Sequence, residues 1–541
     1  MGTGLAAAKR ETLTGGLGLR ATCDWVFSAV WRGSIMNKSA TDSKSAVHRE
    51  GKNAMTNDRT HRNYTRRNVL KTAAGGGAAL AVAAAATPSG AQTPARRPNI
   101  IFILADDMGY ADISCYGRRD LVTPNIDRIA TQGTKFTQAY ANSPVCTASR
   151  VAIITGRYQV RLPVGLEEPL SGRSDRNIGL PADHPTLPSL LKKAGYGTTL
   201  VGKWHLGGLP LFSPHKSGYD HFYGFRSGSI DYYLHTARTG ATDFWDEDKP
   251  LNQEGYSTEL FGNHAVKVIG DYARAGQPFL LSVHFNAPHW PWEGPGDQAE
   301  SERPRGRDPV DWDGGSQETY RRMIAALDVQ VGRVLQALDD NAIARDTIVI
   351  FTSDNGGERY ADTWPFSGRK TELLEGGLRI PAIISWPGRI APGRVSEQVT
   401  ANMDWLPTLL AAAGTAPDAG YPPDGMNLLP HLTAGASVVE RKLFWRYKAN
   451  WQRAARIGDW KYLKILDNTF LFNVVADPLE RANLKERHKD IYDRLIDEWK
   501  AWNATMLPET ATSSTANFTG AEMADHIGTK PVTLDPDPEL R

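Results

Sequence analysis

Four short apolar runs in this 541-residue chain each end at a cluster of polar or ionisable side chains. They cover residues 100–104, 198–201, 279–283 and 347–352. Helical stretches separate them, and this alternation predicts an α/β fold with a mostly parallel central sheet flanked by helices. Because open α/β sheets bind ligands at the carboxyl ends of their strands, we expect the four clusters to converge on one site.

Helical spacing of apolar residues predicts helices over residues 187–194 and 317–339. Beyond Pro422-Pro423 the composition changes, and the chain continues with short alternating strands over residues 443–445, 460–464 and 469–473 and a charged helix over 485–502. We therefore expect a leader over residues 1–91, a catalytic domain over 97–430, a smaller C-terminal α+β subdomain of sheet plus helix over 431–510, and a tail over 511–541. The polar, Pro-rich tail is either disordered or laid over the surface.

The charge balance excludes a general attraction to nucleic acid. Lys and Arg number 62, Asp and Glu number 60, and the formal net charge is +2. An anionic substrate must therefore be bound by local charge at a site, and no nucleic-acid partner is expected. The three cysteines, Cys23, Cys115 and Cys146, are too few for a disulfide framework or a thiolate metal cluster.

The leader carries an export signal. The segment Thr65-Arg-Arg-Asn-Val-Leu-Lys71 precedes an uncharged run rich in Ala and Gly over residues 72–86, and small residues follow at 88–91. This pattern predicts a cleaved twin-arginine signal, the twin-arginine translocase as a partner, and a periplasmic or secreted location. The apolar run is shorter than the roughly 18 residues that span a bilayer, which disfavours an uncleaved anchor.

A further segment reads Asn142-Ser-Pro-Val-Cys-Thr-Ala-Ser-Arg150 and is followed by Thr155-Gly-Arg157. It resembles the signature of the sulfatases, in which Cys-x-Pro-x-Arg is followed by a helix and Thr-Gly-Arg. Further family motifs occur in the family's order: Asp106-Asp107, Gly202-Lys-Trp-His205, Pro288-His289, Asp354-Asn355 and Lys370. The chain thus resembles formylglycine-dependent type I sulfatases of the alkaline phosphatase-like superfamily, in particular bacterial arylsulfatases and N-acetylgalactosamine-6-sulfatases. One departure is Ala148, which stands where most of the family has proline.

Asp106, Asp107, Asp354 and Asn355 offer only oxygen ligands, which favours Ca²⁺ or Mg²⁺ over zinc. The resemblance implies Ca²⁺, with the residue derived from Cys146 as a further ligand. It also implies that a formylglycine-generating maturation enzyme oxidises Cys146 to formylglycine (3-oxoalanine).

The resemblance assigns a role to each remaining site residue. The hydrated aldehyde attacks sulfur, Arg150 holds that aldehyde near the metal, and Lys203 and Lys370 bind sulfate oxygens. His289 protonates the leaving alcohol and His205 takes a proton from the second hydroxyl, which reforms the aldehyde and expels sulfate. His284 lies close in sequence and is the rival for the role of the acid.

The expected activity is hydrolysis of a sulfate monoester, on a carbohydrate or a small aryl compound. Two alternatives stay open from the residues alone. One is a phosphonate or phosphate ester hydrolase of the same superfamily, which would share the metal carboxylates. The other is a catalytically silent anion-binding protein in which Cys146 remains a thiol.

The distance of the export signal from Met1 predicts that translation starts at Met55, or less favourably at Met36. Amino-terminal sequencing of the precursor should then give the residues that follow Met55. A precursor that begins at Met1 would refute the internal start.

Overall fold

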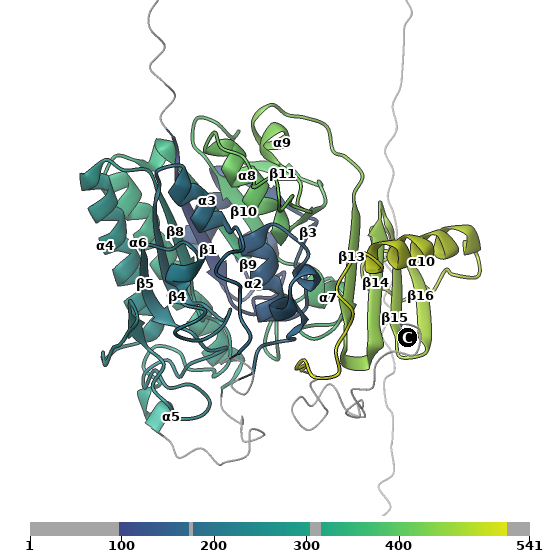
Figure 1. Ribbon diagram of the computed structural model, residues 1–541, viewed down its shortest axis with the longest axis horizontal. Helices are drawn as coiled ribbons and strands as arrows, with labels where there is room; N and C mark the ends of the chain where they lie inside the picture. Colours follow the sequence, from purple (N-terminus) through teal and green to yellow (C-terminus); the bar gives the residue numbers. More distant parts are fainter. Residues whose placement is uncertain (1–96, 172–176, 303–314, 517–541) are drawn as a thin grey trace, which may run out of the picture. The chain divides into compact units, whose positions relative to one another are not determined.

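The computed structural model describes residues 97–171, 177–302 and 315–516. Its centre is a ten-stranded sheet with the strand order β11-β2-β10-β9-β1-β8-β4-β5-β6-β7 (Figure 1). The predictions for the leader, its export signal and the start of translation lie outside the described residues.

The strands of the large sheet are β1 (Asn99–Ala105), β2 (Gly133–Phe136), β4 (Gly197–Lys203), β5 (His221–Phe225), β6 (Trp245–Asp246), β7 (Lys249–Pro250), β8 (Phe279–His284), β9 (Thr347–Ser353), β10 (Ala382–Ser385) and β11 (Arg394–Ser396). A two-stranded sheet pairs β3 (Ala139–Tyr140) with β12 (Thr400–Ala401). The five neighbours β9, β1, β8, β4 and β5 run parallel, whereas β10 is antiparallel to β9 and β2. The prediction of a mostly parallel sheet is confirmed.

The α-helices are α1 (Pro124–Thr131), α2 (Cys146–Thr155), α3 (Leu187–Lys193), α4 (Ser257–Ala275), α5 (Gln298–Glu302), α6 (Gln317–Asp340), α7 (Glu375–Leu378), α8 (Trp405–Ala412), α9 (Leu429–Thr433) and α10 (Lys489–Asn503). Short 3₁₀ turns cover Ser114–Tyr116, Gln159–Arg161, Pro163–Leu166, Pro214–Ser217, Ala344–Asp346, Asn402–Asp404 and Ala449–Trp451. The helices predicted over 187–194 and 317–339 correspond to α3 and α6.

Alternate side chains of β1 enter two separate cores, as the two-residue period of a strand requires. Ile101 and Ile103 pack with buried residues of α1, α4 and α6 on one face. Phe102 and Leu104 pack with buried residues of α2, α3 and α8 on the other. The sheet is therefore covered on both faces, which explains why its central strands are apolar without alternation.

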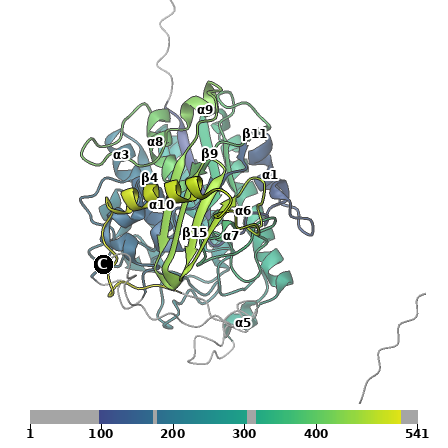
Figure 2. The same cartoon turned by 90° about the vertical axis from the view of Figure 1, so that its right-hand side faces the viewer.

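A second sheet, antiparallel and four-stranded, lies in the C-terminal part of the chain. It has the order β13 (Lys442–Tyr447), β14 (Gln452–Ile457), β15 (Trp460–Ile465) and β16 (Asn468–Asn473). Helix α10 crosses its strands on the side turned toward the viewer in Figure 2. A small sheet with a helix is thus confirmed, although the chain also forms β14, and α10 starts four residues after the predicted position. The division of the chain at residues 430 and 431 stays a prediction.

Among the described residues, no helix combines the length and the apolar character needed to cross a bilayer.

The last described residues run along the segment that precedes Leu170. Glu168 N–H donates to Ser514 O at 3.1 Å, and Ala516 N–H donates to Glu168 O at 2.6 Å. The Glu168 carboxylate accepts from Lys448 N–H at 2.9 Å and from the Thr515 hydroxyl at 3.2 Å. As far as residue 516, the tail follows the second of its two predicted courses and lies against the folded chain.

Burial raises the pKa of Glu168 to about 7, although Lys448 opposes the shift. The folded state therefore holds a proton that the unfolded state releases near pH 4.5. Stability from this group is present below pH 4.5 and is lost as the pH rises toward 7. We predict that the free energy of unfolding of the wild type falls by on the order of 2 kcal/mol between pH 5 and pH 8 because of Glu168. Glu168→Gln, whose side chain stays neutral, should remove this fall.

Urea unfolding of the wild type and of Glu168→Gln at both pH values measures this effect. Glu509→Gln is the control for removal of a nearby carboxylate that raises the pKa of Glu168. The same pH dependence in the wild type and in Glu168→Gln would contradict the prediction.

Candidate active site

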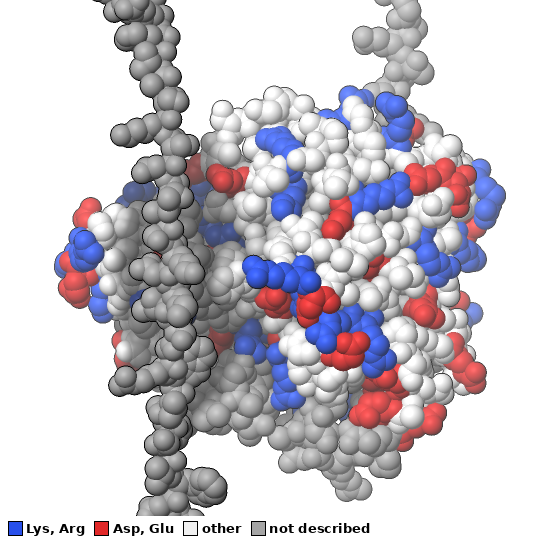
Figure 3. All heavy atoms as spheres, turned by 180° about the vertical axis from the view of Figure 1, so that it is seen from behind, with Lys and Arg blue, Asp and Glu red and all other residues white. Residues whose placement is uncertain are grey.

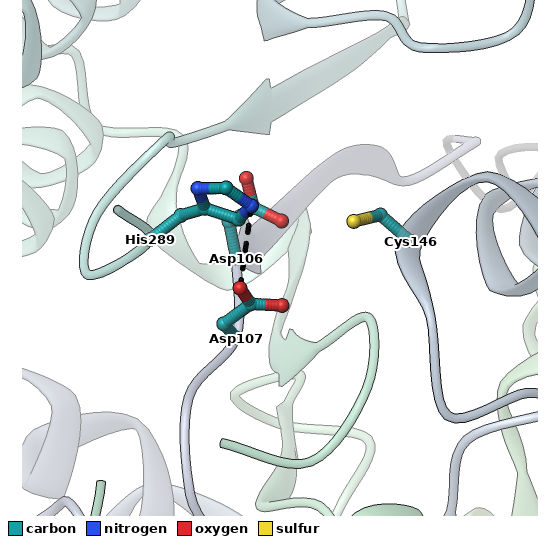
Figure 4. A group of neighbouring side chains, drawn as sticks. All are labelled: Asp106, Asp107, Cys146 and His289. Atoms are coloured by element: carbon teal, nitrogen blue, oxygen red, sulfur yellow. Dashed lines mark ion pairs between the residues drawn. The ribbon is translucent and has the colours of Figure 1, made fainter. Parts of the chain in front are cut away.

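The predicted site residues meet at one edge of the large sheet because they follow its strands or begin the adjoining helix. Asp106 and Asp107 follow β1, Lys203 ends β4, Asp354 and Asn355 follow β9, His289 lies beyond β8, and Cys146 begins α2. Ligand atoms of Asp106, Asp107, Cys146 and His289 all lie within 4.8 Å of one another. In Figure 4, Cys146 faces the other three from a separate element.

Three buried carboxylates are paired with three buried cations. Lys203 Nζ donates to Asp106 Oδ2 at 2.7 Å, and Lys370 Nζ donates to Asp107 Oδ2. Arg150 NH2 lies 3.3 Å from Asp106 Oδ1 and 2.9 Å from Asp354 Oδ2. Such pairing is needed because an isolated charge in a protein interior costs several kcal/mol.

The pairing sets the ionisation of the carboxylates. Burial alone would raise the pKa of Asp106, but Lys203, His289 and Arg150 hold it below its ordinary value. The pKa of Asp107 is likewise lowered against burial, chiefly by Lys370 and His289. Asp106 and Asp107 are therefore anions at neutral pH. For Asp354, burial and the neighbouring Asp106 raise the pKa.

The side chain of Asn355 shows that the group suits a metal ion. Its Nδ2 donates to Asp107 Oδ1 at 2.7 Å and to Gly356 O at 2.9 Å. Its Oδ1 is buried and has no hydrogen-bond partner. An unsatisfied buried oxygen beside carboxylates is the donor set that a hard divalent cation binds. The residues present therefore fit a metal of the Ca²⁺ or Mg²⁺ type.

Cys146 is the first residue of α2, whose ten residues are all buried. Burial raises the pKa of its thiol to about 12, against the effect of Lys203 and Lys370. The thiol is therefore protonated at neutral pH. Ala148 stands in the first turn, where the backbone N–H has no acceptor within the helix, so neither proline nor alanine loses a helical hydrogen bond at this position.

The two candidate acids differ in where their rings point. His289 Nε2 lies 3.2 Å from Lys370 Nζ and 3.3 Å from Asp107 Oδ2, inside the cluster. His284 instead places Nδ1 3.2 Å from Lys203 O and packs its ring against Phe102. Burial and Arg150 lower the pKa of His284 to about 3, whereas Asp107 and Asp106 counteract the lowering at His289. Geometry thus favours His289, and its role stays a prediction.

His205 is buried with one ring nitrogen engaged and the other without a partner. Nε2 lies 3.2 Å from Leu170 O, and Nδ1 has no hydrogen-bond partner. Since a carbonyl only accepts, Nε2 carries the proton and Nδ1 is left as an acceptor. Burial, Lys203 and Arg150 hold the pKa of His205 well below its ordinary value. The ring is therefore a neutral proton acceptor.

Sequence analysis missed Glu358. Its Oε2 lies 3.5 Å from Lys370 Nζ, and burial raises its pKa to about 7. Its position could have indicated it, because Glu358 lies three residues after Asn355, in the segment after β9 that also carries Asp354.

Comparisons with known proteins agree with this geometry. The family model described as Sulfatase matches residues 98–415. Human N-acetylgalactosamine-6-sulfatase is 35% identical over 399 residues, which cover 69% of this chain and 72% of that protein. Human arylsulfatase A is 34% identical over 385 residues, covering 65% and 70%. The crystal structure of Ps i-CgsB superimposes with a TM-score of 0.70 at 29% identity and covers 77% of this chain and 94% of that one.

We predict that a divalent cation stabilises the chelator-treated protein through Asn355. At a concentration of 100 times Kd, the gain should be about 2.7 kcal/mol and should raise the melting temperature. In Asn355→Leu the new side chain has a similar shape but no oxygen. This variant should require a higher cation concentration for the same rise in melting temperature. Thermal unfolding at increasing CaCl₂ measures both. Asn468 is exposed, and Asn468→Leu is the matched control. Identical titrations for Asn355→Leu and the wild type would refute the assignment of Asn355 as a ligand of the cation.

Proposed function

The chain belongs to the sulfatase family and hydrolyses sulfate esters, and on that basis we propose that it acts on a sulfated carbohydrate through a formylglycine made from Cys146 and a bound Ca²⁺. The observation that carries the proposal is the cluster of Cys146, Asp106, Asp107 and His289, whose ligand atoms lie within 4.8 Å of one another. A single centre therefore holds a residue for modification, carboxylates for a cation and a group for proton transfer.

The Ca²⁺ would be held by oxygen atoms of Asp106, Asp107, Asp354 and Asn355 and by the residue derived from Cys146. When bound, it neutralises negative charge on the sulfate oxygens. The described carboxylates of this group are already matched by Arg150, Lys203 and Lys370. A divalent cation thus leaves a net positive site, which attracts a sulfate ester.

The unmodified thiol is a poor nucleophile because its pKa of about 12 leaves almost no thiolate at neutral pH. The formylglycine, when formed and hydrated, supplies an oxygen nucleophile at this position instead. The start of α2 adds backbone N–H groups, which favour an anion there. Lys203 donates to Asp106 and Lys370 donates to Asp107. Each lysine can also donate to a sulfate oxygen at this site.

Two histidines are placed to move protons. His289, with Nε2 beside Asp107, is the group that protonates the leaving alcohol. His205, with Nδ1 as a free acceptor, is the group that removes a proton so that the resting residue is restored. The two roles need opposite protonation states. Burial and Lys370 lower the pKa of His289, and Asp107 and Asp106 oppose that lowering, whereas burial, Lys203 and Arg150 all lower the pKa of His205.

A carbohydrate sulfate is favoured by the relatives. N-acetylgalactosamine-6-sulfatases are similar over most of the chain, and the crystal structure of Ps i-CgsB in complex with k-i-k-neocarrahexaose is 28% identical with a TM-score of 0.68. On the face drawn in Figure 3, Lys and Arg lie among Asp and Glu and do not gather into one basic area. This face therefore shows no continuous basic surface for an anionic sugar.

We also propose periplasmic or secreted action, supported by the twin-arginine pattern over residues 65–91. The family membership favours a sulfatase over a phosphonate or phosphate ester hydrolase and over a silent anion-binding protein.

Mass spectrometry of the tryptic peptide covering residues 136–150 tests the modification. Protein from a host with a formylglycine-generating system should carry an aldehyde at position 146 despite Ala148. Cys146→Ala should fold and lose turnover of sulfate esters. An unmodified thiol in an active preparation, or activity in Cys146→Ala, would refute the proposed nucleophile.

His289→Ala tests the acid. The variant should lose about 100- to 10,000-fold in kcat for a sugar sulfate, whose alkoxide leaves poorly, and much less for an activated aryl sulfate. Steady-state kinetics on both esters measure the ratio. His284→Ala is the matched control and should affect both esters alike. Equal losses on both esters in His289→Ala would contradict a role in protonating the leaving group.

A further inference from the structure

The loop between β9 and β10 carries Lys370 and has a strained backbone directly beside it. Thr371 has φ of 72°, which is in the left-handed region that a β-branched residue rarely adopts. The backbone around it is tied to the active site, since Lys370 N–H donates to Gly357 O at 2.9 Å and Thr371 N–H donates to Pro144 O at 3.0 Å. Such a conformation persists only when neighbouring contacts hold it.

One side chain from the other sheet supplies those contacts. Gln452, at the start of β14, is 1% exposed. Its Nε2 donates to Thr371 O at 2.9 Å, and its Oε1 accepts from Leu373 N–H at 2.8 Å. The two ends of one amide therefore bind the backbone on both sides of residue 372. A third bond, from Nε2 to Ala449 O at 3.1 Å, fixes the amide to the turn between β13 and β14.

A second anchor holds the loop further along. Lys461 Nζ on β15 lies 2.9 Å from Glu375 Oε1, and both side chains are fully buried. Glu375 N–H donates to Glu480 Oε2 at 2.7 Å. The loop is thus fastened to the C-terminal sheet at residues 371–375, immediately after the lysine that enters the active site.

We propose that Gln452 is a positioning residue for sulfate ester hydrolysis, which acts by holding the backbone at Thr371 so that Lys370 stays between Asp107 and His289. This inference rests on the proposed role of Lys370. Lys370 Nζ meets both Asp107 Oδ2 and His289 Nε2, so a shift of the backbone moves the cation away from a carboxylate and a proton donor together. A displacement of about 1 Å can cost on the order of 100-fold in rate.

Gln452→Met, which keeps the length of the side chain and loses all three hydrogen bonds, is the first test. It should lower kcat/KM for a sulfate ester by about tenfold or more and raise the inhibition constant of inorganic sulfate. Deuterium uptake in residues 370–378 should increase, because the Leu373 amide loses its acceptor. Gln452→Asn is one methylene shorter and should change the same quantities less, and it serves if the Met variant does not fold.

Trp499→Phe is the matched control. It removes one buried hydrogen bond in the same C-terminal region, from Trp499 Nε1 to Trp445 O, and this bond does not involve residues 371–375. It should lower the melting temperature and leave kcat/KM, sulfate inhibition and uptake in residues 370–378 unchanged. If Gln452→Met and Trp499→Phe both lost activity in proportion to their loss of melting temperature, the proposal would be overturned.

A double-mutant cycle with Lys370→Ala tests whether Gln452 acts through Lys370. Adding Gln452→Met to Lys370→Ala should lower kcat/KM by less than about twofold more. A further tenfold loss of kcat/KM in the double variant would overturn the inference. Wild-type kinetics in Lys370→Ala would refute the role of Lys370 itself, and with it this inference. Deuterium uptake needs no turnover, so it still reports separately whether Gln452 holds the loop.

Discussion

The site depends on keeping Asp106 and Asp107 ionised inside the protein. Both carboxylates are buried, and burial alone would raise their pKa values. Arg150, Lys203 and Lys370 offset that cost, and each cation comes from a different element. The parallel sheet makes this possible because strands far apart in sequence end at one edge. The fold is thus a means of bringing opposite charges together where water is excluded.

Much of this edge could be predicted from sequence because it depends on local pattern. An apolar run followed by Asp106-Asp107, or by Asp354-Asn355, marks both the strand and the polar cluster after it. The same reasoning could not orient a ring. Whether His289 or His284 faces the cluster depends on the course of the chain after β8, and the engaged nitrogen of His205 depends on a carbonyl 35 residues away.

The supporting contacts were harder to predict than the site. Strand β14 has the sequence Gln452-Arg-Ala-Ala-Arg-Ile457, with two buried arginines and no apolar alternation, so its pattern does not indicate a strand. Arg456 reaches Tyr140, and Tyr140 OH donates to Glu375 Oε2 at 2.6 Å. Arg456 is buried with partners more than 300 residues away, and Arg453 is buried with Glu509, 56 residues away. Pairing over such distances leaves no local trace in sequence.

The buried ion pair of Lys461 with Glu375 has a consequence for the order of events during synthesis. The ribosome makes Cys146 more than 300 residues before Lys461, and until then the loop of Lys370 lacks its anchors in the C-terminal sheet. In the folded protein Cys146 is only 2% exposed, so little of its thiol is accessible to another protein. Under the proposed modification, an enzyme would therefore meet the thiol more readily before the chain folds than in the folded protein.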